Sequence, residues 1–150
     1  AEHNTTSDKN PISNESGEQQ NFIGRPKAGL GLWASCIRLF DASQGKSLDV
    51  IELENNEAAM SICTCIFHEK PNDTFIAIGT ASGLQLTPRK VNGGFLHIYR
   101  VVQAANGSPE PWKLEFVHKT EVEDVPAALC PFQGRLLAGV GNMLRIYDLG

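Results

Sequence analysis

Cys63 and Cys65 are the residues whose type and spacing come nearest to a metal site. In a strand, residues two apart place both sulfurs on one face with Cα atoms about 6.5 to 7 Å apart, which suits half a zinc site better than a disulfide. Cys36 and Cys130 do not supply the second close pair that zinc requires. We therefore expect no metal ion and interpret the four cysteines as buried free thiols.

Two glycine-containing segments resemble parts of nucleotide-binding motifs. Gly29-Leu-Gly-Leu-Trp-Ala34 fits a relaxed Gly-x-Gly-x-x-Gly/Ala pattern, but it follows a polar stretch instead of joining a strand to a helix, so its amides would not face a pyrophosphate. Gly45-Lys46-Ser47 matches the end of a phosphate-binding loop, whereas Phe40 stands where the first glycine belongs. We expect a polar hairpin turn at residues 45–47, and no bound cofactor.

Three histidines, His68, His97 and His118, fall on or near separate expected strands. No nucleophile motif such as Gly-x-Ser-x-Gly accompanies them, so a catalytic triad cannot be assembled from the sequence. We predict a protein without catalytic residues or a small-molecule substrate. An enzymatic alternative would need a pocket with convergent titratable groups.

Charged residues gather in two expected loops. Arg89 and Lys90 precede a Gly-Gly pair, while Glu121, Glu123 and Asp124 crowd the turn before Val125-Pro126. In a propeller, loops of these two types open on the same face, and charge of mixed sign there could steer a protein partner. These five residues are candidates for a partner surface, with plain solvated loops as the alternative.

Composition bounds the class of protein. The chain has 150 residues, 41% of them hydrophobic, and a formal charge of −4, so it carries no excess of Lys and Arg for gripping nucleic acid. It shows no secretory leader and no apolar run near the length of about 18 to 20 residues that a membrane span needs. We expect a soluble, intracellular chain without direct contact to RNA or membrane.

The pattern along the chain predicts an all-β protein behind a polar tail. Residues 1–21 contain too few apolar side chains to fold, residues 22–32 read as a loop, and residues 1–32 are therefore predicted to form a disordered tail or linker and loop. From Trp33, short runs rich in β-branched and aromatic residues alternate with turn residues. The expected strands are 33–40, 47–54, 58–67, 74–80, 94–102, 112–119, 126–131, 135–140 and 143–149.

An internal repeat indicates the architecture. A five-residue pattern starts at Ile37, Leu96 and Leu144, and in each copy aliphatics at the first and third places face one way and an aromatic at the fourth faces the other. Both faces of such a strand can be buried. Similar strands precede the last two copies, which predicts four-stranded meanders, the blades of a propeller. Residues 33–150 are expected to form an incomplete β-propeller segment of about two blades, interrupted in mid-blade at Gly150.

Several longer stretches carry a family resemblance. They include Asn56-Glu-Ala-Ala59, Pro88-Arg-Lys-Val-Asn-Gly-Gly-Phe95, Leu114-Glu-Phe-Val-His-Lys-Thr120 and Leu144-Arg-Ile-Tyr-Asp-Leu-Gly150. With them, residues 26–150 resemble the family of large propeller subunits found in splicing factor 3b (as its subunit 3), in damaged-DNA binding and in cleavage and polyadenylation. The splicing member is the nearest likeness. This sequence departs from the family's pattern at Leu30 and Leu32, in the polar insert 103–109 and in the tail 1–21, and these segments identify neither the species nor the linker.

The resemblance implies a role beyond anything that strand periodicity shows. Members of the family contain three seven-bladed propellers, and this segment would be the start of the last one. The implied function is a scaffold in the nucleus that contacts the helical-repeat and small subunits of splicing factor 3b within the U2 small nuclear ribonucleoprotein, and reaches RNA only through that complex. The alternative is a related scaffold of a cullin ubiquitin ligase or of mRNA 3′-end cleavage and polyadenylation.

Overall fold

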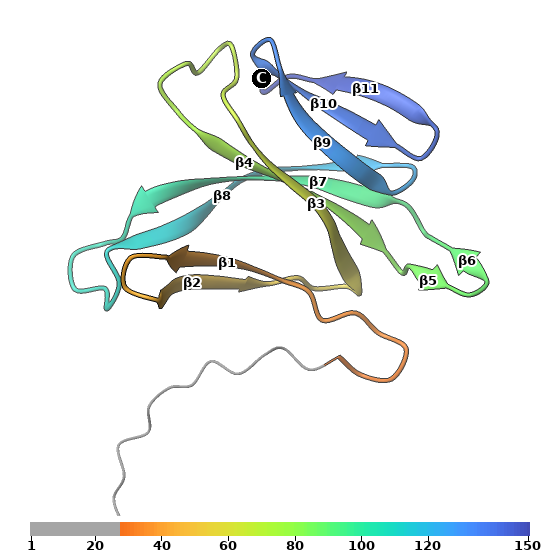
Figure 1. Cartoon of the computed structure of the whole chain (residues 1–150), viewed down its shortest axis with the longest axis horizontal. Helices are drawn as coiled ribbons and strands as arrows, with labels where there is room; N and C mark the ends of the chain where they lie inside the picture. The colour runs from red at the N-terminus through yellow and green to blue at the C-terminus, as the bar shows by residue number, and fades with distance from the viewer. Residues whose placement is uncertain (1–27) are drawn as a thin grey trace, which may run out of the picture.

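The computed structural model describes residues 28–150, whose regular structure is entirely β-strand (Figure 1). The predicted tail, 1–21, lies outside the described residues, as do residues 22–27 of the expected loop. The nine predicted strands are all present, with ends displaced by at most three residues. They are β1 (Cys36–Asp41), β2 (Lys46–Glu52), β3 (Glu57–Cys65), β4 (Phe75–Ser82), β7 (Gly94–Gln103), β8 (Trp112–Val122), β9 (Pro126–Phe132), β10 (Arg135–Val140) and β11 (Met143–Tyr147).

Two short strands were not predicted, β5 (Gln85–Leu86) and β6 (Arg89–Lys90), which pair as a small hairpin. Residues 28–150 contain no helix long and apolar enough to cross a membrane. The segment 52–60, whose composition favours helix, instead forms a turn and the start of β3. Asn55 and Asn56 adopt left-handed backbone angles there, with φ of 55° and 56°, a region that asparagine tolerates better than most residues.

The remaining strands form three antiparallel sheets. The middle sheet has the order β3-β4-β7-β8, so each strand pairs with its neighbour along the chain, apart from the inserted β5–β6 hairpin. β1 pairs with β2 on one side of it, and β9, β10 and β11 form a three-stranded meander on the other (Figure 1). The repeated pattern falls on the third strand of both meanders, β7 and β11, which is the placement expected for propeller blades.

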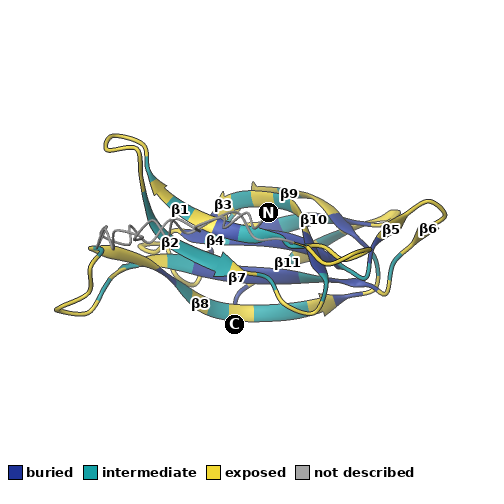
Figure 2. Ribbon diagram, turned by 90° about the horizontal axis from the view of Figure 1, so that it is seen from below, coloured by how far each residue is buried: buried dark blue, intermediate teal, exposed yellow. Residues whose placement is uncertain are grey.

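The middle sheet is buried on both faces. Leu96 and Ile98 of β7 pack with Leu136, Ala138 and Val140 of β10 in one core cluster. On the opposite face, Ile78 and Tyr99 pack with Ile37, Leu39 and Ile51 of the β1–β2 sheet. Figure 2 shows this burial concentrated on β4 and β7. The all-β prediction, with sheets arranged as a partial propeller, is confirmed.

The expectation that both faces of each repeat copy are buried holds only for the middle copy. Leu96 and Ile98 are 2% and 5% exposed, whereas their counterparts in β11, Leu144 and Ile146, are 73% and 56% exposed. Phe40 of the first copy is also exposed. The physical reason is stacking: only the middle sheet has a described sheet against each face.

Candidate interaction face

The β5–β6 hairpin projects from the end of the middle sheet (Figures 1 and 2). Its root is held by Leu84 and Val91, which pack with Ala58, Ala81 and Val125 in a small core cluster. Trp33 donates a hydrogen bond from Nε1 to the carbonyl of Leu84 over 2.7 Å. Residues 85–90 beyond this root are exposed. The hairpin is therefore a firmly anchored projection that carries Arg89 and Lys90.

The β8–β9 turn lies beside this hairpin and carries the acidic candidates. Arg89 reaches Asp124 at 3.7 Å between guanidinium nitrogen and carboxylate oxygen. Glu123 forms an ion pair with Arg145 of β11. Glu121, at the end of β8, is exposed opposite Phe95 of β7. We call the surface made by the hairpin and this turn the loop face; it brings Arg89 and Asp124 together, while Lys90 and Glu121 form no ion pair within residues 28–150.

Close backbone approaches hold the turn in place. A Cβ on Gly94 would meet the carbonyl oxygens of Thr80 and Asp124 and the ring of Pro126. Gly141, in the β10–β11 turn, has a left-handed φ of +57°, and a Cβ there would lie 2.6 Å from the Asp124 carboxylate. The loop face thus lies where the middle sheet and the third sheet approach each other closely.

A chain of polar side chains crosses the middle sheet beneath the loop face. Glu57, Thr80, His97 and Lys119 contribute one residue each from β3, β4, β7 and β8. The Glu57 carboxylate accepts from Thr80 Oγ1 at 2.7 Å, lies 2.7 Å from His97 Nε2, and accepts from Lys119 Nζ at 2.6 Å. Lys119 also stands over the Phe95 ring at 3.9 Å. We call these four residues the polar chain.

Burial and hydrogen bonding set the charges of the polar chain. Burial acts to raise the pKa of Glu57, but hydrogen bonds from Lys119, Thr80 and His97 outweigh it, so this pKa lies below its ordinary value. Burial lowers the pKa of His97, which the bond to Glu57 only partly offsets. A neutral His97 therefore donates from Nε2, and its buried Nδ1 has no partner among residues 28–150. In the resulting carboxylate–ammonium pair the Glu57 carboxylate is buried, whereas the Lys119 side chain is 32% exposed, and this arrangement suits a structural role.

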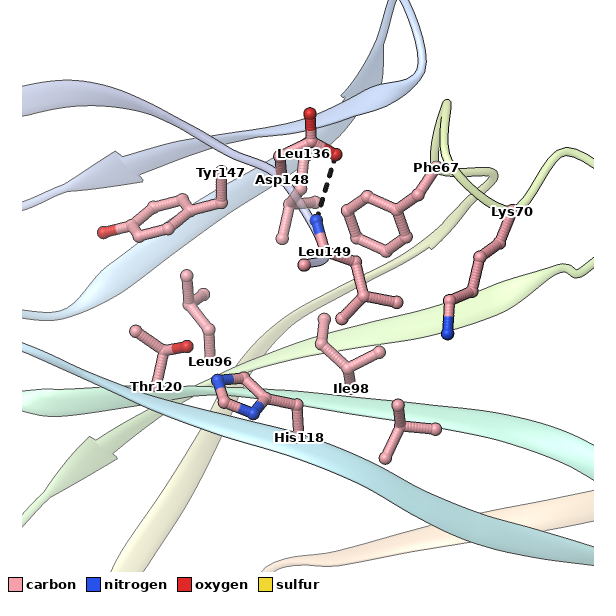
Figure 3. Close-up of a pocket in the computed structure, with 12 residues that line it drawn as sticks. Phe67, Lys70, Leu96, Ile98, His118, Thr120, Leu136, Tyr147, Asp148 and Leu149 are labelled. Atoms are coloured by element: carbon pink, nitrogen blue, oxygen red, sulfur yellow. Dashed lines mark hydrogen bonds between the residues drawn. The ribbon is translucent and has the colours of Figure 1, made fainter.

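A cavity away from the loop face lies between the middle sheet and the end of the third sheet (Figure 3). It measures about 280 Å³ and is lined mainly by apolar side chains, including Phe67, Leu96, Ile98 and Leu149. Its titratable members are Lys70, His118, Tyr147 and Asp148. Asp148 accepts from the Leu149 amide at 3.0 Å and from Arg135 Nε at 3.1 Å.

The cysteines depart in part from expectation. All four are free, but only Cys65 is fully buried, Cys36 and Cys63 are half-buried, and Cys130 is exposed, so the prediction of four buried thiols is wrong. Burial raises the pKa of Cys63 to about 11, which keeps it a weakly reactive thiol. Residues 28–150 contain no cluster of three or more His, Cys, Asp or Glu side chains fit to hold a metal ion.

The other sequence motifs are structural. Residues 42–45 form the turn between β1 and β2, with Gly45 at a φ of +65°; the predicted hairpin turn is present, but it ends at Gly45, and Lys46 and Ser47 begin β2. Residues 29–34 lie in the loop before β1. His68, His97 and His118 stand on or beside separate strands. Sequence reasoning missed Glu57, Thr80 and Lys119. Of these three residues, only Lys119 is a charged residue inside a predicted strand, 112–119, and this is the one signal that could have indicated the polar chain.

Comparison with known proteins adds what the geometry cannot supply. Residues 34–150 match the family described as the CPSF A subunit region. Splicing factor 3B subunit 3 of Danio rerio is 51% identical over 129 residues, covering 86% of this chain and 10% of that protein. Spliceosome-associated protein 130 A of Arabidopsis thaliana is 47% identical over 143 residues, covering 95% of this chain and 11% of that protein.

A fungal protein extends the comparison. Pre-mRNA-splicing factor rse1 of Emericella nidulans is 48% identical over 129 residues, covering 85% of this chain and 10% of that protein. The chain therefore spans about a tenth of the length of the curated relatives it matches.

Proposed function

Because this chain belongs to the CPSF A subunit region family, we propose that it is part of a non-catalytic β-propeller scaffold that acts in pre-mRNA splicing. The observation that carries the proposal is identity of 47 to 51% with proteins named as splicing factors or spliceosome-associated proteins, over most of the chain. The names of these relatives favour splicing over a ubiquitin ligase or mRNA 3′-end processing.

The structure supports a scaffold in its own way. Blade-like sheets stack face to face, and Glu57, Thr80 and His97 beneath the loop face are buried inside the middle sheet. In this proposal residues 33–150 form the start of the last propeller of a longer polypeptide, and residues 1–32 form its linker. The scaffold acts in the nucleus, within the U2 small nuclear ribonucleoprotein, and reaches RNA only through its protein partners.

The proposed partners are the helical-repeat and small subunits of splicing factor 3b. The loop face is the contact surface we assign to them, with Arg89, Lys90, Glu121, Glu123 and Asp124 as its charged residues. Support comes from the position of these side chains, which lie on or next to a projecting hairpin and a turn anchored by the middle sheet; binding residues concentrate on such connections.

Affinity capture from nuclear extract tests this function. The longer polypeptide that contains this segment, carrying a tag, is expected to co-purify splicing factor 3b subunits and U2 small nuclear RNA, identified by mass spectrometry and RNA sequencing. Ribonuclease treatment should release the RNA and leave the proteins bound. Recovery of a cullin, or of the cleavage and polyadenylation machinery, in place of the splicing proteins would overturn the proposal.

A further inference from the structure

The tip of the β5–β6 hairpin combines an aliphatic side chain with two cations on a rigid base. Leu86 is 70% exposed, and Arg89 lies directly opposite it in the pairing of β5 with β6. Lys90 pairs with Gln85 and forms no ion pair within residues 28–150. Arg89 is held only by the 3.7 Å contact to Asp124, with two thirds of its side chain exposed. Both cations are available to an incoming carboxylate.

The anchoring of the hairpin makes this exposure informative. Leu84 and Val91 at its root are packed into a core cluster, and the Asn92 amide donates to the Ser82 carbonyl over 2.9 Å. An anchored projection loses little conformational entropy when it is bound, which favours recognition. Leu86, in contrast, contributes nothing to the stability of the chain in its exposed position.

We propose that the β5–β6 hairpin is a docking site for an extended acidic protein segment that contains an aliphatic or aromatic side chain. Carboxylates of that segment pair with Arg89 and Lys90, and its apolar side chain covers Leu86. This inference rests on the proposed scaffold function, and names the chemistry of the partner at one part of the loop face.

Charge and hydrophobicity together select a protein segment over RNA. Two exposed cations alone would suit phosphates as well as carboxylates. An aliphatic side chain such as Leu86 is a poor platform for bases, which stack on aromatic or guanidinium planes, and this favours a peptide. The peptide presents carboxylates to Arg89 and Lys90 and turns its remaining acidic residues away from Glu121, Glu123 and Asp124, which repel them.

Peptide binding tests the inference directly. The longer polypeptide that contains this segment is immobilised at low surface density, so that contacts between copies do not contribute, and is exposed to a soluble synthetic peptide in which glutamates flank leucines. Arg89→Glu with Lys90→Glu should weaken binding about tenfold, and Leu86→Ser about fivefold. Added salt should weaken binding of the unaltered chain and leave the charge-reversed variant little changed.

Matched controls separate the effect of the hairpin residues on binding from the effect of overall charge. Arg38→Glu with Lys113→Glu changes the net charge equally at two exposed positions outside the loop face, and should bind the peptide as the unaltered chain does. A peptide with serine in place of leucine should bind as weakly as the Leu86→Ser variant binds the original. Amide hydrogen exchange of β4 and β7 confirms that each variant is folded.

Several results would overturn the docking inference. These are no measurable binding at millimolar peptide, equal binding by the hairpin and control variants, and preference of the hairpin for a single-stranded RNA oligonucleotide over the peptide. The same charge-reversed variant, placed in the capture experiment, keeps the two proposals distinguishable. Unchanged recovery of splicing proteins together with absent peptide binding would reject the hairpin site and leave the scaffold function standing.

Discussion

At the scale of single residues, Glu57 shows how one buried carboxylate organises four strands. Its partners Thr80, His97 and Lys119 are 23, 40 and 62 residues away in sequence, and each stands on a different strand of the middle sheet. Because both carboxylate oxygens are engaged, a slip of any one strand would leave a buried charge or donor unpaired. The polar chain therefore specifies strand register as well as contributing to stability.

Removal of the shared acceptor should be costly. Glu57→Ala leaves the Lys119 ammonium, the Thr80 hydroxyl and the His97 ring without their partner, and we expect it to lower the free energy of opening of the middle sheet by about 3 to 5 kcal/mol. Glu57→Gln keeps the shape of the side chain and one acceptor oxygen, so this substitution should lower the free energy of opening by less. Residue-resolved hydrogen exchange of β4 and β7 measures the effect.

The control for this prediction is Glu69→Ala, at an exposed position in the β3–β4 loop, which should change the opening free energy by under about 0.5 kcal/mol. Equal effects of the Glu57 and Glu69 substitutions would show that the polar chain does not stabilise the sheet.

His97 makes stability depend on pH in a defined window. Its folded pKa lies below the ordinary 6.5, so the unfolded chain takes up a proton first as the pH falls. The contribution of His97 to stability is complete above about pH 6.5 and is lost as the pH drops toward the pKa of His97 in the folded chain. Glu57, whose pKa lies below 4.5, extends this loss of stability into more acid solution. Opening free energies from pH 7.5 to 5.5 should therefore decrease.

A histidine variant isolates this contribution. His97→Asn should flatten the dependence between about pH 6.5 and 5.5, whereas His68→Gln, at an exposed position, should preserve its slope. Stability that rises on acidification in the unaltered chain would contradict the sign of the assignment.

At the scale of elements, strand pairing was predictable and strand surroundings were not. Alternation and turn residues located nine strands, and the hairpin at Gly45 followed from its polar sequence. The β5–β6 pair was missed because strands of two residues carry no periodicity. The burial of Glu57 and the exposure of Cys130 depend on which sheet stacks against which, and nothing local to either residue encodes that.

The candidate site was predicted to a similar extent. Glu123 and Asp124 lie in a turn, whereas Arg89 and Lys90, expected in a loop, form β6, and Glu121 lies near the end of β8. Two ion pairs, Arg89 with Asp124 and Glu123 with Arg145, depend on how the middle sheet and the third sheet pack against each other. The projection of the hairpin followed only from the structure.

Two glycines allow the second and third sheets to meet closely. A Cβ on Gly79 would clash with Ser61 Oγ and with Pro126, whose carbonyl oxygen would lie at 2.6 Å. Gly79→Ala and Gly94→Ala should each lower the free energy of opening by about 1 to 3 kcal/mol, because backbone must move to make room. Differential hydrogen exchange of β4 and β9 measures this separation.

Gly139→Ala is the matched control, since a Cβ there meets only Ala128 at 3.6 Å, an ordinary contact. We expect it to be neutral or slightly stabilising, because alanine has the lower conformational entropy when unfolded. Should all three substitutions act alike, close approach at β9 would not be what joins the sheets.

At the scale of the whole molecule, the three sheets differ in how fully they are covered. The outer face of the third sheet presents Leu144 and Ile146. Met60 and Ile62 of β3, and Ile66 just after it, are also substantially exposed among residues 28–150. In the middle sheet, the counterparts of Leu144 and Ile146 lie beneath another sheet. Because the repeats are similar, we infer that these outer faces are suited to packing against further sheets of the same kind.

This chain, studied by itself, should consequently associate or unfold instead of melting as a cooperative monomer. Apolar faces of this extent drive association, and the free strand edges of β8 and β11 favour it further. Leu144→Lys with Ile146→Lys should raise the fraction of monomer, relative to the unaltered chain, in sedimentation velocity over a series of concentrations. Ser43→Lys with Gln44→Lys adds the same charge in the polar β1–β2 turn and should leave association unchanged. A sharp, reversible melt of the unaltered monomer would show that the faces need no neighbours, and with it the stacking argument for a partial propeller would fail.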